Sequence, residues 1–221
     1  MERLIIIGDI HGCYYELIEL TATVKFDKET DMLVFLGDYI DRGKYSYEVV
    51  EYIKSLQKES KFVTALKGNH EDMMCKAIET NDNSLWLYNG GGQTKKSYYR
   101  NNKPYNVHYN WFKNLPLRID IAGFDISVAH SAYVNADIVD DSATDYILWD
   151  REWIDSVSKK FDKQFVFGHT PHNEVYITPN GSIGIDTGCV FGGKLTACVV
   201  TKGTTNENIY NYISINKIKE V

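Results

Sequence analysis

Three short blocks of polar residues each follow an apolar run near the front of the chain. They are Gly8-Asp9-Ile10-His11-Gly12, Gly37-Asp38-Tyr39-Ile40-Asp41-Arg42-Gly43 and Gly68-Asn69-His70-Glu71. Carboxylate, amide and imidazole groups bind divalent metal ions, and two ions held roughly 3.5–4 Å apart can hydrolyse a phosphate ester. The blocks therefore predict a binuclear metal centre with phosphate-ester chemistry.

The spacing of these residues suggests how the two ions are held. Asp9 and His11 stand at i and i+2, so in an extended segment their side chains face the same way and can bind one ion. Asp38 ends the next apolar run, and we expect its carboxylate to bridge the ions. Asn69 can give a neutral oxygen to the second ion. Two histidines, each closing a later apolar run, complete the predicted ligand set: His130 and His169.

Alternating apolar patterns predict the elements that position these blocks. Three continuous apolar runs are typical of strands covered on both faces: 4–7, 32–36 and 62–66. Three segments with helical spacing follow them in turn: 14–24, 46–56 and 71–78. Ser46 is the predicted N-cap of the second helix. This order predicts parallel strands joined by right-handed crossovers, with ligands beyond the carboxyl ends of the strands, where the three blocks stand.

The rest of the chain is first polar and then rich in strand patterns. Residues 81–116 predict short helices and loops that cap the sheet, and three aromatic residues could anchor them: Trp86, Trp111 and Phe112. A hairpin is expected over 119–128, with its turn at Ala122-Gly123. Five later strands are predicted, at 164–167, 175–178, 182–185, 194–201 and 208–215. We therefore expect one domain over residues 1–221, with a parallel-rich and an antiparallel-rich half in two stacked sheets.

The composition argues against some classes of function. The formal net charge is −6, from 24 Lys+Arg against 30 Asp+Glu, which argues against a nonspecific nucleic-acid or membrane-surface binder. The four cysteines have no C-x-x-C spacing and are expected to be reduced thiols. The apolar run at 4–7 is too short for a signal peptide or a membrane span, so we expect a cytoplasmic protein.

The ordered blocks resemble the phosphoprotein phosphatase family of metallophosphoesterases, most closely its short bacterial and phage serine/threonine phosphatases. The family pattern is met at residues 8–12, 37–43, 68–71, 130 and 168–170. The resemblance implies an α/β fold, a four-layer α-β-β-α sandwich with two mixed sheets. It also implies two divalent metal ions, with Mn²⁺ expected first and Fe or Zn²⁺ as alternatives. One departure is Lys67, where many members carry arginine.

The resemblance further implies a mechanism for these side chains. A water bridging the two metals attacks phosphorus as hydroxide. Arg42 and Arg151 clamp the phosphate oxygens, with Asn69 beside them, and Arg151 comes from a segment, Leu148-Trp149-Asp150-Arg151, similar to the family's second arginine segment. His70 protonates the leaving alkoxide, and Asp41 orients that imidazole.

Three functions remain in competition. The first is a metal-dependent phosphomonoesterase acting on phosphoserine and phosphothreonine in proteins, with phosphotyrosine and small phosphoesters as further substrates. The second is a hydrolase of dinucleoside polyphosphates such as diadenosine tetraphosphate. The third is a catalytically silent binding module, which would lack His70 or Arg42, and both are present. Glu71 and the intact Asp41-Arg42 pair favour the first. No nucleic-acid or membrane partner is expected, and the sequence makes no prediction of oligomeric state.

Overall fold

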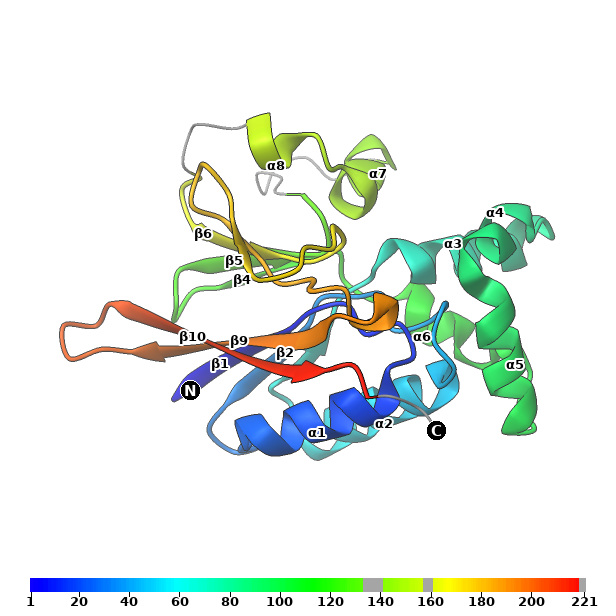
Figure 1. The fold of residues 1–221 in the computed structure, drawn as a ribbon, viewed down its shortest axis with the longest axis horizontal. Coiled ribbons are helices and arrows are strands. Elements are labelled where there is room, and N and C mark those ends of the chain that lie inside the picture. The colour runs from blue at the N-terminus through cyan, green and yellow to red at the C-terminus, as the bar shows by residue number, and fades with distance from the viewer. Residues whose placement is uncertain (133–140, 157–160, 219–221) are drawn as a thin grey trace.

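Strand β1 (Arg3–Ile7) shows why two sheets stack in this chain. Its apolar side chains are buried on both faces and alternate between two clusters. Ile5 and Ile7 pack with residues of the helices below, whereas Leu4 and Ile6 pack with residues of a second sheet above. A strand that is apolar on both faces must be covered on both, so β1 lies in an inner layer (Figure 1).

The computed structural model describes residues 1–132, 141–156 and 161–218. It holds two five-stranded sheets, with strand orders β10-β9-β1-β2-β3 and β4-β5-β6-β8-β7. Besides β1, the first sheet contains β2 (Met32–Phe35), β3 (Val63–Ala65), β9 (Lys194–Lys202) and β10 (Asn208–Asn216). The second contains β4 (Arg118–Ile121), β5 (Ile126–Ala129), β6 (Gln164–Phe167), β7 (Tyr176–Ile177) and β8 (Ile183–Gly184).

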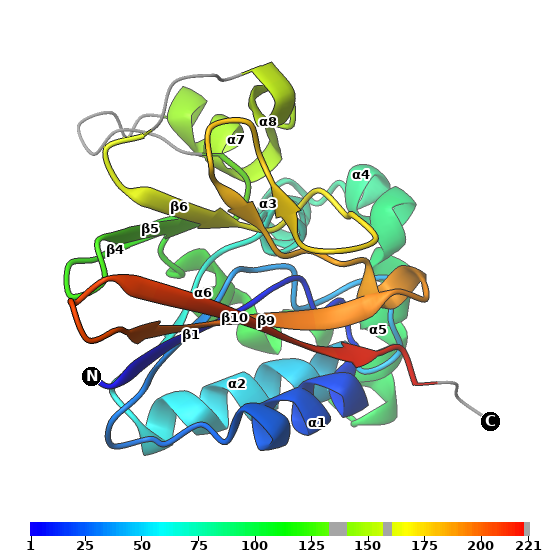
Figure 2. The ribbon, with the colours of Figure 1, turned by 60° about the vertical axis from the view of Figure 1, so that its left-hand side comes forward.

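Helices cover the outer faces of both sheets, which gives four layers (Figures 1 and 2). Below the first sheet lie α1 (Tyr14–Val24) and α2 (Ser46–Glu59); above the second lie α7 (Asp141–Trp149) and α8 (Trp153–Ser156). A third apolar cluster, which includes Phe165, Phe167 and Trp153, fills the space between β6 and α8. The expected α-β-β-α sandwich with two mixed sheets is confirmed, because each sheet contains both parallel and antiparallel pairs.

The remaining helices gather at one end of the sandwich, at the right of Figure 1. They are α3 (Asn69–Thr80), α4 (Ser84–Trp86), η1 (Leu87–Gly91), α5 (Gly92–Arg100), η2 (Tyr105–His108) and α6 (Tyr109–Lys113). One further short helix, η3 (Cys189–Phe191), precedes β9. The prediction of short helices over 81–116 is confirmed. Trp86 and Phe112 are buried there, and Trp111 is partly buried against the same core.

Parallel pairing of β1 with β2 and of β2 with β3 is as predicted. The carboxyl ends of these strands lead into the segments that carry the three polar blocks, and the carboxyl ends of β5 and β6 in the second sheet lead to His130 and His169. Strand β9 pairs antiparallel with the other side of β1, which places residues near the end of the chain beside the first strand.

Three local predictions are wrong. The β4–β5 turn spans residues 122–125 instead of Ala122-Gly123, because Phe124 is drawn into the core between the sheets and Asp125 takes the left-handed conformation, with φ 55°. Ser46 is the first residue of α2, not its cap, and its hydroxyl accepts from the Asp41 N–H instead. Helix α3 begins at Asn69, before the predicted start at Glu71.

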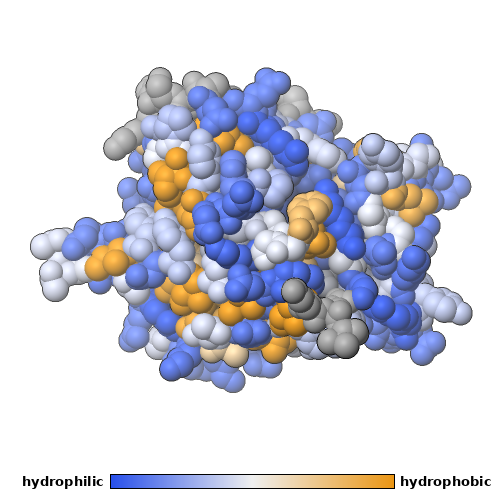
Figure 3. Space-filling model, viewed as in Figure 1, coloured by the Kyte–Doolittle hydropathy of each residue, from blue (hydrophilic) through white to orange (hydrophobic). Residues whose placement is uncertain are grey.

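The face seen in Figure 3 is mostly hydrophilic, and hydrophobic residues on it form small separate patches. Over residues 1–132, 141–156 and 161–218, no helix has the length and hydropathy required to cross a bilayer.

Candidate metal centre

The loops after β1 and β2 are joined to each other by their backbones. The N–H groups of Ile10 and His11 both donate to the Asp38 carbonyl oxygen, at 3.1 and 2.8 Å. His11 and Asp38 have left-handed backbones, with φ 45° and 52°. The extended geometry assumed for Asp9 and His11 is therefore wrong, because a turn after Asp9 brings the imidazole to the site. The adjoining loops fix both side chains relative to one another.

Glu71 holds the second loop in place. Its two carboxylate oxygens accept from four backbone N–H groups, those of Asp38, Tyr39, Ile40 and Gly68, at 2.8–3.3 Å. Burial and the nearby Asp38 raise the pKa of Glu71 to about 8, while these amide bonds act in the opposite direction. Glu71, the last residue of the third block, therefore stabilises the loop that carries Asp38.

Glu71→Gln is expected to lower the free energy of unfolding of the metal-free protein by about 2 kcal/mol or more. The new amide nitrogen must face two N–H groups, which leaves buried donors without an acceptor. Urea unfolding measures the change. Glu79→Gln is the control, because Glu79 lies at the surface beside Lys113. A Glu71→Gln midpoint equal to that of wild type would contradict the role of the carboxylate.

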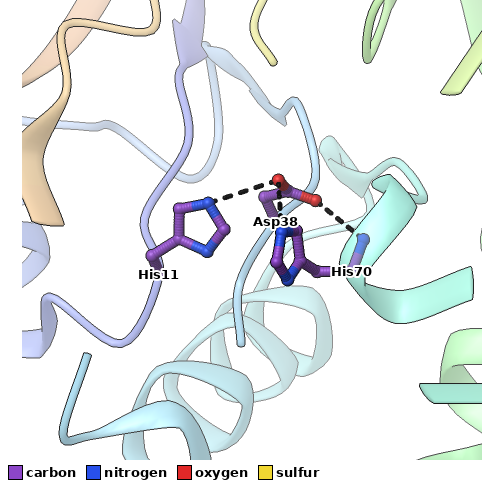
Figure 4. Close-up of side chains that lie close together, drawn as sticks. All are labelled: His11, Asp38 and His70. Carbon is purple, nitrogen blue, oxygen red and sulfur yellow. Dashed lines mark hydrogen bonds and ion pairs between the residues drawn. The ribbon is translucent and has the colours of Figure 1, made fainter. Parts of the chain in front are cut away.

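Asp38 lies between two groups of ligand atoms. On one side, His11 Nε2 is 3.3 Å from Asp38 Oδ2. On the other, His130 Nε2 is 3.4 Å from Asp38 Oδ1. Figure 4 shows the imidazoles of His11 and His70 turned toward this carboxylate from separate segments. A carboxylate with one oxygen toward each group has the geometry of a bridge.

The second group brings together side chains from the first turn of α3 and from the segments that follow β5 and β6. The Asn69 side-chain amide lies 3.0 Å from His130 Nε2 and 3.1 Å from His169 Nδ1, and these two nitrogens are 3.2 Å apart. His169 is in the left-handed conformation, with φ 66°. Its N–H donates to both oxygens of Asp9 at 3.1 Å, which links the first and last predicted ligands.

The imidazoles have the orientation that metal ligands need. His11 Nδ1 donates to the Ile40 carbonyl oxygen at 2.8 Å, and His130 Nδ1 donates to that of Leu36 at 3.0 Å. Each bond fixes the ring so that the Nε2 lone pair faces Asp38, the arrangement usual for histidines that bind a metal. Burial lowers the pKa of His130, and burial with the neighbouring His130 lowers the pKa of His169 to about 2.

The carboxylates show an excess of negative charge at the centre. Burial, with Asp186 and Asp38 nearby, raises the pKa of Asp9 well above its usual value. Burial also raises the pKa of Asp186 to about 6. Burial acts to raise the pKa of Asp38 as well, but His130, His70 and His11 outweigh it and hold that pKa well below the usual value. Buried carboxylates and converging lone pairs of this kind fit divalent cations, which would neutralise them.

His70 forms a buried pair with Asp41. Its Nδ1 lies 2.7 Å from Asp41 Oδ2, and neither side chain is more than 1% exposed. Its Nε2 is buried, has no hydrogen-bond partner among the described residues, and lies 3.9 Å from Asp38 Oδ2. An imidazole held at Nδ1 by a carboxylate can carry a proton on Nε2 and donate it toward the centre.

Two arginines lie near this centre. Arg42 contacts His11 Nε2 through its guanidinium, which lies 5.3 Å from the centre of the exposed Phe191 ring. Arg151 is exposed, and its Nη2 donates to the His169 carbonyl oxygen at 3.3 Å. Each of the two guanidinium groups therefore contacts a residue predicted to bind metal, and the two lie on different sides of Asp38.

The structure brings the six predicted ligands, His70 and the two arginines to one end of the sandwich, and their roles remain predictions. Asn69 lies in the first turn of α3 and does not end a strand as expected. Sequence reasoning missed three residues that contact or adjoin the centre: Trp86, Thr94 and Asp186. Asp186 follows β8 at its carboxyl end, so the same rule that selected Asp9 could have found it. Trp86 and Thr94 have no comparable sequence pattern.

The family profile of calcineurin-like phosphoesterases matches residues 2–211. The chain belongs to this family. The phosphoesterase is 32% identical over 199 residues to serine/threonine-protein phosphatase 1 of Salmonella typhimurium, with 86% of this chain and 88% of that protein covered. It is also 29% identical over 227 residues to a bis(5'-nucleosyl)-tetraphosphatase of Oceanobacillus iheyensis, with 88% and 87% covered.

Solved structures agree with the fold of the phosphoesterase. A protein serine/threonine phosphatase from Saccharomyces cerevisiae superimposes with a TM-score of 0.75 at 17% identity, over 100% of this chain and 81% of that one. A cold-active protein-tyrosine phosphatase from a Shewanella species gives 0.64 at 18% identity, over 95% and 80%. At these identities the likeness concerns the fold alone. The enzyme class, a phosphoesterase hydrolase that uses metal ions, follows from the family.

Proposed function

We propose that this phosphoesterase removes phosphate from phosphoserine and phosphothreonine in proteins. The observation that carries the proposal is the buried His70–Asp41 pair, with Nε2 aimed toward Asp38. An alkoxide is a poor leaving group and needs a proton, which this imidazole can supply. A phosphoanhydride has a better leaving group and needs that proton less. The similarity to two bacterial serine/threonine-protein phosphatases, over 86% of the chain in each case, supports the same substrate class.

In this proposal, two groups of side chains hold the metals. Asp9 and His11 would bind one ion, Asn69, His130 and His169 would bind the other, and Asp38 would contact both. Two divalent cations, most readily Mn²⁺, would supply Lewis-acid activation of the phosphate and of the attacking water. The four cysteines are free and buried, which is consistent with work in the reducing cytoplasm.

The remaining side chains act on the substrate. The guanidinium groups of Arg42 and Arg151 bind the non-bridging phosphate oxygens and balance the charge that develops on them. The Asn69 amide would contact the same oxygens. His70 Nε2 gives its proton to the leaving oxygen as the P–O bond breaks, and the Asp41 carboxylate stabilises the charged imidazole before the transfer. His70 takes up a proton from water to complete the cycle.

A second candidate function is hydrolysis of dinucleoside polyphosphates. The Phe191 ring is 65% exposed and adjoins the Arg42 guanidinium, so it offers an aromatic surface beside the phosphate-binding side chains. A nucleobase can stack on such a surface. Several bis(5'-nucleosyl)-tetraphosphatases are 28–30% identical to this chain, which supports the same alternative.

A panel of substrates separates the two functions. We expect the Mn²⁺-loaded enzyme to hydrolyse phosphoserine and phosphothreonine peptides with a kcat/KM at least about tenfold above that for diadenosine tetraphosphate. Phosphotyrosine peptide and nitrophenyl phosphate complete the panel, and chelation should abolish activity on all of them. A higher kcat/KM for diadenosine tetraphosphate would replace the first function by the second.

A further inference from the structure

The Asp41 carboxylate is enclosed by donors from a region far away in the sequence. Trp86 Nε1 lies 2.9 and 3.0 Å from its two oxygens, and Thr94 Oγ1 lies 2.6 Å from Oδ1. Asp41 and Thr94 are 0% exposed, and Trp86 is 1% exposed. Solvent therefore cannot set the orientation of this carboxylate, and the protein donors must do so.

Thr94 bonds to Asp41 at two points. Its hydroxyl donates to the carboxylate, and the same oxygen accepts from the Asp41 backbone N–H at 2.8 Å. These two hydrogen bonds close a ring of atoms that fixes both the side chain and the left-handed backbone of Asp41, which has φ 70°. The ring also adjoins Ser46, whose hydroxyl oxygen lies 3.2 Å from Thr94 Oγ1.

A glycine leaves room for the Trp86 indole beside Asp41. A Cβ on Gly91 would come within 2.5 Å of the Trp86 ring, so only glycine permits the observed approach. Neighbouring Gly90, with φ 104°, accepts the Arg42 N–H at 3.3 Å. The short helices of residues 84–100 thus contact the Asp41–Arg42 loop through an indole, a hydroxyl and a backbone carbonyl.

We propose that Trp86 and Thr94 are positioning residues for His70. They hold Asp41 where it accepts the Nδ1 proton, so that Nε2 keeps the proton needed by the leaving group and points toward the centre. A carboxylate that holds a catalytic imidazole acts in this way when its own orientation is fixed. The inference rests on the phosphomonoesterase function proposed above, and it gives the region around 84–100 a task in catalysis.

The proposal predicts a loss that depends on the leaving group. Trp86→Phe keeps an aromatic ring and removes one donor; Thr94→Val keeps the shape and removes the other. Each variant is expected to lower kcat about tenfold on a phosphoserine peptide, the loss typical of one hydrogen bond to a charged group. On nitrophenyl phosphate, whose leaving group needs little protonation, the loss should stay below about threefold. KM and metal content should not change.

The matched control is Trp111→Phe. It removes an indole N–H from the same group of helices, but that N–H bonds to Gln57 Oε1 at 3.0 Å instead of Asp41. We expect it to retain wild-type kcat on both substrates.

A second comparison uses His70→Asn as the background. Because Trp86 and Thr94 act through His70, adding either change to His70→Asn should cause no further loss of kcat. Equal losses on the two substrates, or a full tenfold loss in the His70→Asn background, would overturn the assignment in favour of a structural role. If the wild-type enzyme hydrolyses neither the phosphoserine peptide nor nitrophenyl phosphate, the proposed function is wrong. The assignment of Trp86 and Thr94 as positioning residues, which rests on that function, is then wrong as well.

Discussion

Asp38→Asn is expected to abolish turnover and to reduce bound metal from about two ions per chain to one or fewer. One carboxylate oxygen of Asp38 faces His11, and the other faces His130 on the opposite side. An amide has one oxygen and no charge, so it cannot bridge two cations that repel each other. Elemental analysis after reconstitution with Mn²⁺ measures the metal content, and hydrolysis of nitrophenyl phosphate measures the activity.

Asp120→Asn provides the matched control for Asp38→Asn. Asp120 lies on β4, pairs with Arg118 and Lys163, and belongs to neither ligand group, so two ions and full activity should remain. An Asp38→Asn protein that still holds two ions per chain would contradict the bridge. Circular dichroism of both variants excludes unfolding as the cause of lost metal.

His70→Asn is expected to keep both metal ions and to lower kcat by about 10²–10⁴, the usual range for general-acid catalysis. The imidazole is engaged by Asp41 through Nδ1, which leaves only Nε2 to face the centre. The loss should be larger for a phosphoserine peptide than for nitrophenyl phosphate, because the alkoxide depends on a donated proton.

Equal losses of kcat on the two substrates would refute the acid role of His70. A loss of metal in His70→Asn would point to a different role, because His11, Asp38 and His70 also lie close enough together to hold an ion. Elemental analysis of the variant therefore accompanies the kinetics, with the Asp38→Asn protein as the reference for a damaged centre.

Local patterns in the sequence were sufficient for the first half of the fold. The apolar run of β1 and the helical spacing of α1 are each visible within a short window, and their alternation predicts a parallel sheet. In such a sheet the blocks after β1, β2 and β3 must meet at one edge. The polar types in those blocks, and the histidines that follow β5 and β6, then limit the chemistry to metal-assisted attack on phosphate.

Only the tertiary structure determined how these side chains are held. Trp86 lies 45 positions from Asp41 and Thr94 lies 53, so no local pattern connects them to it. The same holds for Glu71, which binds the N–H groups of the Asp38 loop, and for Phe124, whose burial between the sheets sets the β4–β5 turn. Sequence periodicity records which face of an element is apolar, whereas the partner that fills a buried space is chosen by packing of the whole chain.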